Sequence, residues 1–223
     1  MKHLITAANR GIGLEFARQL AAAGESVIAT ARPGTDVAEL EQLDVRIERL
    51  DVSDSASAEA LAAKLGSEPI DVLVNNAGFY PKGGAFEELD MDSMLEAFNV
   101  NSLGAMRVTQ ALLPNLRLGK AKKIVQVTSK MGSMIDNNSG GSYAYRMSKA
   151  ALNMFNTSLA VDLNDDGFCC AIVHPGWVQT RMGGDSAPIT TEESVSGLLK
   201  VIASLKPTDS GAFFDYAGVR IGF

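Results

Sequence analysis

Short, wholly apolar runs alternate along this chain with longer segments of helical periodicity, and this alternation constrains the fold more than any other feature. Most runs are apolar throughout, as in strands buried on both faces of a parallel sheet. Strands are predicted over His3–Ala7, Ser26–Ala31, Val45–Asp51, Asp71–Asn75, Lys123–Ser129, Phe168–His174 and Ala212–Tyr216. Helices are predicted over Gly11–Ala23, Ser55–Leu65, Met91–Leu118, Tyr143–Leu163 and Thr191–Leu205. We expect Pro114 to bend or end the third helix.

Strands and helices in this order are joined by right-handed crossovers. The sequence therefore predicts an α/β fold, a Rossmann-type doubly wound parallel sheet with helices on both faces. The 223 residues contain no repeat, low-complexity tract or linker, so we expect one domain over residues 1–223. Because ligands of such sheets bind at the carboxyl ends of the strands, the residues that follow each strand are the candidate site.

Net charge and cysteine content indicate which kinds of partner and which cellular compartment are expected for this chain. The chain has 20 Lys and Arg against 26 Asp and Glu, a net charge of −6, which gives no global attraction for nucleic acid or anionic lipid. The adjacent Cys169 and Cys170 would form only a strained disulfide, so reduced thiols and a cytoplasmic location are expected. No apolar stretch approaches the roughly 20 residues of a membrane span. The isolated His3 and His174 predict no metal site.

A glycine-rich turn, Thr-Ala-Ala-Asn-Arg-Gly-Ile-Gly, follows the first predicted strand. Its glycines let the backbone approach a pyrophosphate, and the following helix offers free N–H groups and a favourable dipole. Glycines also close plain strand–helix turns, but the first βα unit is where a dinucleotide fingerprint belongs. The predicted cofactor-binding residues of this turn are Thr6, Ala7, Asn9, Arg10, Gly11, Ile12 and Gly13.

The end of the second strand predicts which dinucleotide is bound. Enzymes that prefer NAD usually carry an acidic residue there, which binds the ribose 2′-hydroxyl. This chain has Thr30, Ala31 and Arg32 instead. No carboxylate repels a 2′-phosphate, and the guanidinium groups of Arg10 and Arg32 are available to bind one. We predict a preference for NADP(H) over NAD(H); the alternative is that both arginines are solvated surface residues.

Tyr145 and Lys149 are four residues apart and share one face of a predicted helix. An unperturbed tyrosine has a pKa of about 10, too high for efficient proton transfer at neutral pH. A neighbouring ammonium stabilises the phenolate, so we expect Lys149 to lower the pKa of Tyr145 and suit it to acid–base catalysis. Tyr143 has Met147 at the same spacing and is excluded.

Ser129 ends the fifth predicted strand, where the site should lie, and Ser133 in the following loop is its rival. We prefer Ser129 and expect it to donate a hydrogen bond to the substrate oxygen. Residues after strands four, five and six line an apolar substrate pocket or pack in the core: Phe79, Tyr80, Met131, Met134, Trp177 and Met182.

Together these motifs resemble the short-chain dehydrogenase/reductase family over nearly the whole chain. The turn resembles Thr-Gly-x-x-x-Gly-x-Gly, except that Ala7 replaces the first glycine, which is tolerable if Ala7 keeps a negative φ. Residues 75–78 match Asn-Asn-Ala-Gly, and residues 175–180 match Pro-Gly-x-Val-x-Thr. The separation of Ser129 and Tyr145 slightly exceeds the family's, which implies a small insertion around Asp136–Asn138.

The resemblance implies roles for further residues. Asp51, beside Val52, would accept from the adenine amino group, and Asn75 would tie neighbouring strands together. Asn101 would hold a water that returns protons through Lys149, which would also bind the nicotinamide ribose, with the nicotinamide against Tyr145. The other cofactor-binding residues implied are Val52, Asn76, Ala77, Gly78, Pro175, Gly176, Val178 and Thr180.

Within the family, residues 139–145 and 211–218 look like the C-factor and carbonyl-reductase-like group. This implies an oxidoreductase that transfers hydride between NADP(H) and a carbonyl or alcohol substrate. Residues 181–190 lie where the family places its substrate lid, and because this segment is short, we expect the substrate to be small. The alternative is a dinucleotide-binding signalling or regulatory protein whose catalysis is incidental. The family often pairs its long helices, so a homodimer or homotetramer through Met91–Leu118 and Tyr143–Leu163 is a further expectation.

Overall fold

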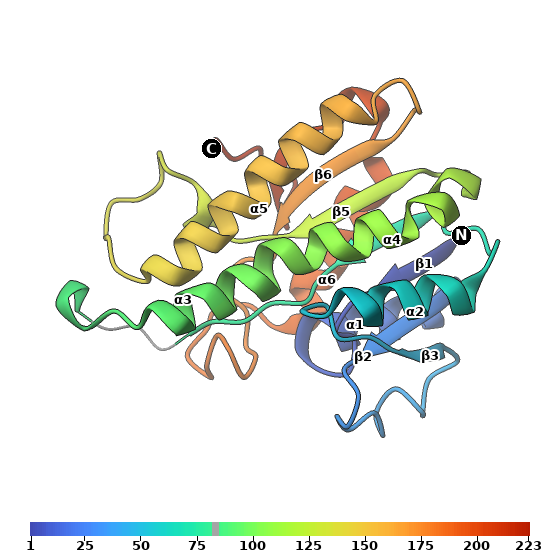
Figure 1. The fold of residues 1–223 in the computed structure, drawn as a ribbon, viewed down its shortest axis with the longest axis horizontal. Coiled ribbons are helices and arrows are strands. Elements are labelled where there is room, and N and C mark those ends of the chain that lie inside the picture. The colour runs from blue at the N-terminus through green and yellow to red at the C-terminus, as the bar shows by residue number, and fades with distance from the viewer. Residues whose placement is uncertain (82–84) are drawn as a thin grey trace.

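The apolar runs form one seven-stranded parallel sheet in a computed structural model, which describes residues 1–81 and 85–223 (Figure 1). The strands are β1 (Lys2–Ile5), β2 (Ser26–Ala31), β3 (Arg46–Arg49), β4 (Val72–Asn75), β5 (Lys123–Val127), β6 (Cys169–His174) and β7 (Phe213–Asp215). Their order is β3-β2-β1-β4-β5-β6-β7. The winding therefore reverses between β1 and β4, and a ligand crevice is expected at the carboxyl ends of these two strands.

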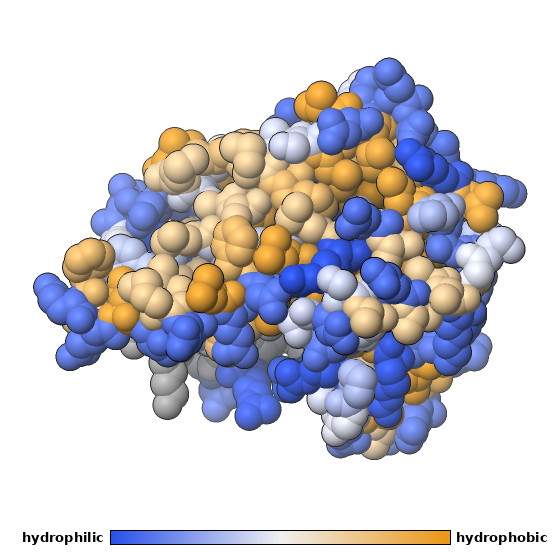
Figure 2. All heavy atoms as spheres, viewed as in Figure 1, coloured by the Kyte–Doolittle hydropathy of each residue, from blue (hydrophilic) through white to orange (hydrophobic). Residues whose placement is uncertain are grey.

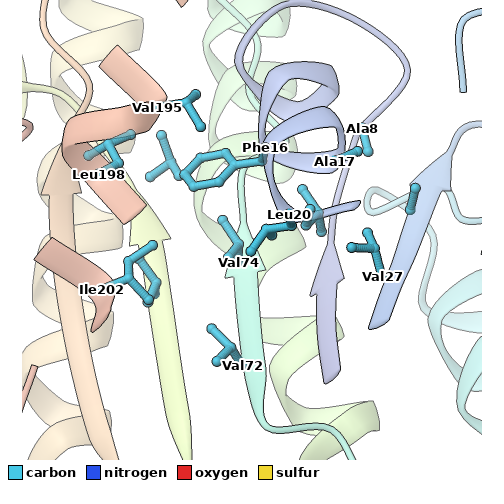
Figure 3. Packing of buried hydrophobic residues seen from close by; sticks show 14 of the residues in the cluster. Ala8, Phe16, Ala17, Leu20, Val27, Val72, Val74, Val195, Leu198 and Ile202 are labelled. Carbon is cyan, nitrogen blue, oxygen red and sulfur yellow. The ribbon is translucent and has the colours of Figure 1, made fainter. Parts of the chain in front are cut away.

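Helices cover both faces of the sheet, which confirms the predicted fold class (Figure 1). One face carries α1 (Gly11–Ala22) and α6 (Thr191–Ser204), and the other carries α2 (Ser55–Leu65), α4 (Gly104–Leu118) and α5 (Tyr143–Asp162). Figure 3 shows Phe16 of α1 directed toward Val195 and Leu198 of α6, and Leu20 of α1 lying near Val74 of the sheet. Short 3₁₀ turns occupy Phe86–Glu88, Lys130–Gly132 and Pro207–Asp209.

The segment predicted as one helix over Met91–Leu118 has three parts. These are α3 (Met91–Phe98), a π-helical segment (Asn99–Leu103) and α4. The prediction that Pro114 ends a helix is wrong, because α4 continues through it to Leu118. Pro114 is exposed, so water can satisfy the carbonyl group that loses its amide partner.

The two core layers divide the adjacent cysteines between them. Cys169 packs in the core under α1 and α6, and Cys170 packs in the core under α5. Both are buried free thiols, and burial raises the pKa of Cys169 to about 11 and that of Cys170 to about 12. They pack as small apolar groups. Among residues 1–81 and 85–223, no helix has the length and apolar character needed to cross a membrane.

Candidate active site

The turns after β1 and β4 are bound to each other at the point where the winding reverses. The Thr6 hydroxyl accepts hydrogen bonds from the backbone N–H groups of Asn76 and Ala77, both at 2.9 Å. The Asn76 amide nitrogen donates to the carbonyl oxygens of Thr6 at 3.0 Å and Ala7 at 3.2 Å. The expectation that Asn75 ties the strands is therefore wrong for its side chain, which donates instead to Thr109 of α4 at 3.0 Å.

Ala7 has a φ of +51°, so the condition of a negative φ, under which alanine would be tolerable at this position, is not met. The hydrogen bond from Asn76 to its carbonyl fixes this left-handed conformation, as does the bond from the Ala8 N–H to Thr30 at 2.7 Å. A Cβ atom at Gly13 would collide with the Ala7 carbonyl oxygen and the Asn76 side chain. Ala7 therefore adopts the left-handed conformation that glycine usually supplies in such turns.

The first turn of α1 is open to a ligand. Arg10, the residue directly before α1, makes no side-chain capping bond. The N–H groups of Gly11, Ile12 and Gly13 are therefore not capped by its side chain. The Asn9 side chain turns away and donates to the Asp36 carbonyl oxygen at 3.0 Å. A tightly packed glycine turn, followed by a helix whose first N–H groups have no side-chain cap, fits the pyrophosphate of a dinucleotide.

The residues predicted to bind the adenosine part lie after β2 and β3. Arg10 and Arg32 are both exposed. Burial of Asp51 acts to raise its pKa, but hydrogen bonds from Ser53 and the charge of Arg32 outweigh it and lower the pKa. Val52 packs against Gly104 of α4, where a Cβ atom would come within 2.9 Å of the Val52 side chain. Arg32 thus lies close enough to Asp51 for its charge to act on this carboxylate.

The segment after β6 closes the other end of this crevice. Gly176 has a φ of +87°, and a Cβ atom there would collide with Ile189. Val178 is buried and bridges to Ile189, while the Pro175 carbonyl oxygen accepts from Ser194 at 2.6 Å. The Thr180 side chain lies 3.5 Å from the Cβ position of Gly11, which brings the predicted nicotinamide-binding segment to the glycine turn.

Tyr145 and Lys149 are both buried on α5, beside the carboxyl end of β5. Burial raises the pKa of Tyr145 to about 12, although a hydrogen bond with Ser129 opposes this shift. Burial lowers the pKa of Lys149 to about 8. Contrary to the expectation that Lys149 lowers the pKa of Tyr145, burial sets the direction of the shift here, and the Lys149 ammonium donates to the Val127 carbonyl oxygen at 2.9 Å.

The two candidate serines point in different directions. Ser129 interacts with Tyr145 and accepts a hydrogen bond from the Met131 N–H at 3.1 Å. The Ser133 hydroxyl is buried and donates to the Gly222 carbonyl oxygen at 2.6 Å, near the end of the chain. The geometry therefore favours Ser129, because only its hydroxyl is placed beside the tyrosine.

Asn101 lies in the π-helical segment and holds the loop after β4 in place. Its side chain accepts from the Phe79 N–H at 2.6 Å and donates to the Phe79 carbonyl oxygen at 2.8 Å. It also donates to the Ser148 hydroxyl at 2.9 Å. Gly78 lies between Asn101 and Lys149, with both side chains 3.7 Å from its Cβ position. The water relay assigned to Asn101 stays a prediction.

Sequence reasoning missed Ser148, which lies directly before Lys149 and joins Asn101 to α5. The sequence spacing could have indicated Ser148, because a polar residue three positions after Tyr145 lies on the same face of the helix. In the described part of the chain, the structure brings no three histidine, cysteine or acidic side chains together as metal ligands.

Three comparisons with known proteins bear on this arrangement. The model of the short chain dehydrogenase family matches residues 2–189. C-signal of Myxococcus xanthus is 48% identical over 162 residues, 73% of this chain and 98% of C-signal. The carbonyl reductase Sniffer of Drosophila melanogaster superposes with a TM-score of 0.94 at 31% identity, covering 100% of this chain and 99% of Sniffer. An NADPH-bound carbonyl reductase from chicken fatty liver superposes with a TM-score of 0.92 at 34% identity, covering 100% of this chain and 98% of the chicken chain.

Proposed function

Because the chain belongs to the short-chain dehydrogenase family, we propose that it is an oxidoreductase that transfers hydride between NADP(H) and a small carbonyl or alcohol substrate. The observation that carries the proposal is the placement of Ser129, Tyr145 and Lys149 beside the end of β5. The glycine turn and the segments after β4 and β6 would hold the cofactor around them.

The chemistry divides between cofactor and protein. The bound dinucleotide supplies or accepts the hydride. In reduction, Tyr145 gives its proton to the alkoxide that forms from the carbonyl, and its raised pKa keeps it protonated at neutral pH until then. Ser129 donates a second hydrogen bond to the same oxygen, where negative charge develops in the transition state. Lys149, charged below its pKa of about 8, stabilises the phenolate that remains.

The test is the Tyr145→Phe variant, with Tyr143→Phe as its matched control on the same helix. Removing a general acid costs roughly 10²–10⁴ in rate, so Tyr145→Phe should lose that factor in kcat while its Kd for NADPH stays unchanged. Tyr143→Phe should keep wild-type kcat. Reduction of aldehydes, ketones and quinones is followed by NADPH consumption, and full activity of Tyr145→Phe would end the proposal.

The NADP(H) preference rests on Arg10 and Arg32. Both are exposed beside the glycine turn, and the chicken structure that this chain resembles contains NADPH. Arg32→Asp should reduce kcat/KM for NADPH relative to NADH by about tenfold or more, because it replaces a charge-assisted contact with repulsion. Arg117→Asp is the control, since Arg117 pairs with Asp166 elsewhere on the surface. Equal efficiency of the wild type with NADH and NADPH refutes the preference.

A second candidate is a signalling or regulatory protein that binds the dinucleotide, and the identity with C-signal favours it. The two candidates separate by turnover. Tight NADPH binding without turnover of any carbonyl in a broad panel would favour the signalling function. The buried Tyr145 and Lys149 favour catalysis, because binding alone does not need an acid–base pair.

We also propose that the long helices pair two copies of the chain. Their outward side chains are apolar over a continuous face, as Figure 2 shows around α3, α4 and α5. The exposed apolar residues of this face are Met91, Leu95, Phe98, Met106, Met147, Met154 and Val161. Met154→Glu should dissociate the oligomer, and sedimentation of the wild type as a monomer would refute the pairing.

A further inference from the structure

The ring of Tyr80 lies over the ring of Tyr145. Their centroids are 4.6 Å apart and the ring planes are tilted by 49°. Tyr145 is only 9% exposed, whereas Tyr80 is 40% exposed. Tyr80 therefore forms the solvent side of the environment that buries Tyr145. It comes from the loop after β4, so the contact joins this loop to the start of α5.

Ser142 holds Tyr80 in this position. The two hydroxyl oxygens are 2.7 Å apart. A serine directly before a helix usually accepts hydrogen bonds from the first free N–H groups. Ser142 does not do so: it takes a left-handed conformation, with φ +47° and ψ +38°, and makes no side-chain capping bond to α5. Strained residues that forgo a local bond cluster at functional sites, and here the hydroxyl is directed at Tyr80.

A second aromatic contact joins the same two segments of the chain. Phe86 meets the ring of Tyr143 edge-on, with centroids 5.6 Å apart. Tyr143 lies two residues before Tyr145, so it is on a different face of α5, and it is itself exposed. Both contacts join the segment after β4 to the start of α5, but only Tyr80 touches the tyrosine of the site. The pair Tyr143 and Phe86 thus provides a control for loss of an aromatic contact alone.

The groups that surround Tyr145 are few. Ser129 interacts with its hydroxyl, and the Lys149 ammonium lies 5.8 Å from its ring centroid. Glu88 and Asp90, from the segment before α3, line the small cavity next to it. Burial, with a further contribution from Tyr80, raises the pKa of Tyr145. Of these neighbours, Tyr80 is the one whose ring lies against the Tyr145 ring, and it is 40% exposed.

We propose that Tyr80 is a positioning residue for the proton donor: pinned by Ser142, it covers one face of Tyr145, excludes water from it and leaves its hydroxyl directed at Ser129. This inference rests on the proposed function for its consequence in catalysis, but the cover itself is a property of the chain alone. It implies that Tyr80 controls the protonation of Tyr145 without touching the proton that is transferred.

The test measures nitration of each tyrosine by tetranitromethane, which attacks accessible phenolates, with the sites read by peptide mapping. In Tyr80→Leu, Tyr145 should be nitrated at least about tenfold faster, the factor by which one unit of pKa changes the phenolate fraction. Ser142→Gly, which removes the pinning hydroxyl and relieves the left-handed strain, should give a smaller increase. Tyr143→Phe, the matched control, should leave nitration of Tyr145 unchanged.

The kinetic arm measures the pH profile of alcohol oxidation. The limb on which the rate rises as Tyr145 loses its proton should move to lower pH by about one unit in Tyr80→Leu and stay in place in Tyr143→Phe. A merely structural role would lower kcat without moving this limb. Unchanged nitration of Tyr145 in a folded Tyr80→Leu variant overturns the inference. Absence of turnover in the wild type refutes only the proposed function, because nitration needs no turnover.

Discussion

The left-handed Ala7 predicts an unusual result: replacing it with glycine should stabilise the protein. A left-handed conformation costs an L-residue about 1–2 kcal/mol. Glycine removes this cost but adds about 0.4–1 kcal/mol of entropy to the unfolded chain. Ala7→Gly should therefore raise the free energy of unfolding by about 0.5–1 kcal/mol, taken as the difference of these two terms.

Gly11 supplies the matched reverse experiment, because it lies in the same turn with a φ of +54°. Its Cβ position meets only the Thr180 side chain, at an ordinary contact distance of 3.5 Å. Gly11→Ala therefore adds left-handed strain without a collision, and it should destabilise by about the amount that Ala7→Gly stabilises. Gly13→Ala should destabilise more, because its Cβ atom would strike the Ala7 carbonyl oxygen.

Urea denaturation of the cofactor-free protein, followed by circular dichroism, measures the three variants. A gain of 1 kcal/mol also corresponds to a rise of about 2–4 °C in Tm for a chain of this size. If Ala7→Gly is neutral or destabilising while Gly11→Ala destabilises as expected, Ala7 does not hold a strained conformation and the reasoning about this turn is refuted.

Three further predictions follow from the site and its surroundings. The kcat/KM for carbonyl reduction should fall above about pH 8 as Lys149 loses its charge, and a flat profile through that range contradicts this. Burial lowers the pKa of His174 from 6.5 to about 4. As the pH falls between these two values, His174 becomes protonated in the unfolded chain but stays neutral in the folded one, so the free energy of unfolding decreases over this range. His174→Gln should reduce that loss in urea titrations; an equal loss would exclude His174 as its source. Asn76→Ala removes both side-chain bonds to the turn after β1 and should cost about 1–3 kcal/mol, against less than about 0.5 for Asn138→Ala at an exposed position, and equal costs would refute the tie between the two turns.

The sheet and the order of its motifs could be predicted because they depend on local chemistry. Apolar runs bounded by turn residues specify buried strands, and the residues after β1, β4, β5 and β6 meet at one edge in any doubly wound sheet. Tyr145 and Lys149 share a helix face for the same local reason. The placement of Ser129 rather than Ser133 beside Tyr145 agrees with the choice of the residue that ends the strand.

The details that depend on distant partners could not be read from the sequence. Alanine at position 7 favours a negative φ on its own, but Asn76 and Gly13 fix the opposite sign. The side chains of Asn75 and Asn76 point to opposite sides of the sheet, and only the strand register decides which of them reaches the turn after β1. The sequence shows the charge of Lys149 but does not show that Tyr80, far away in the chain, excludes water from Tyr145.

Burial therefore changes how the acid–base pair should work. It drives both groups toward their neutral forms, since the pKa of Tyr145 rises to about 12 and that of Lys149 falls to about 8. At neutral pH the pair is still a neutral phenol beside an ammonium, because Lys149 keeps its proton below pH 8. In the proposed reduction, the attraction between phenolate and ammonium would arise only after Tyr145 has given its proton to the substrate, so it would stabilise the product of proton transfer rather than the resting site. This is the condition under which an interaction accelerates a reaction instead of merely tightening the ground state.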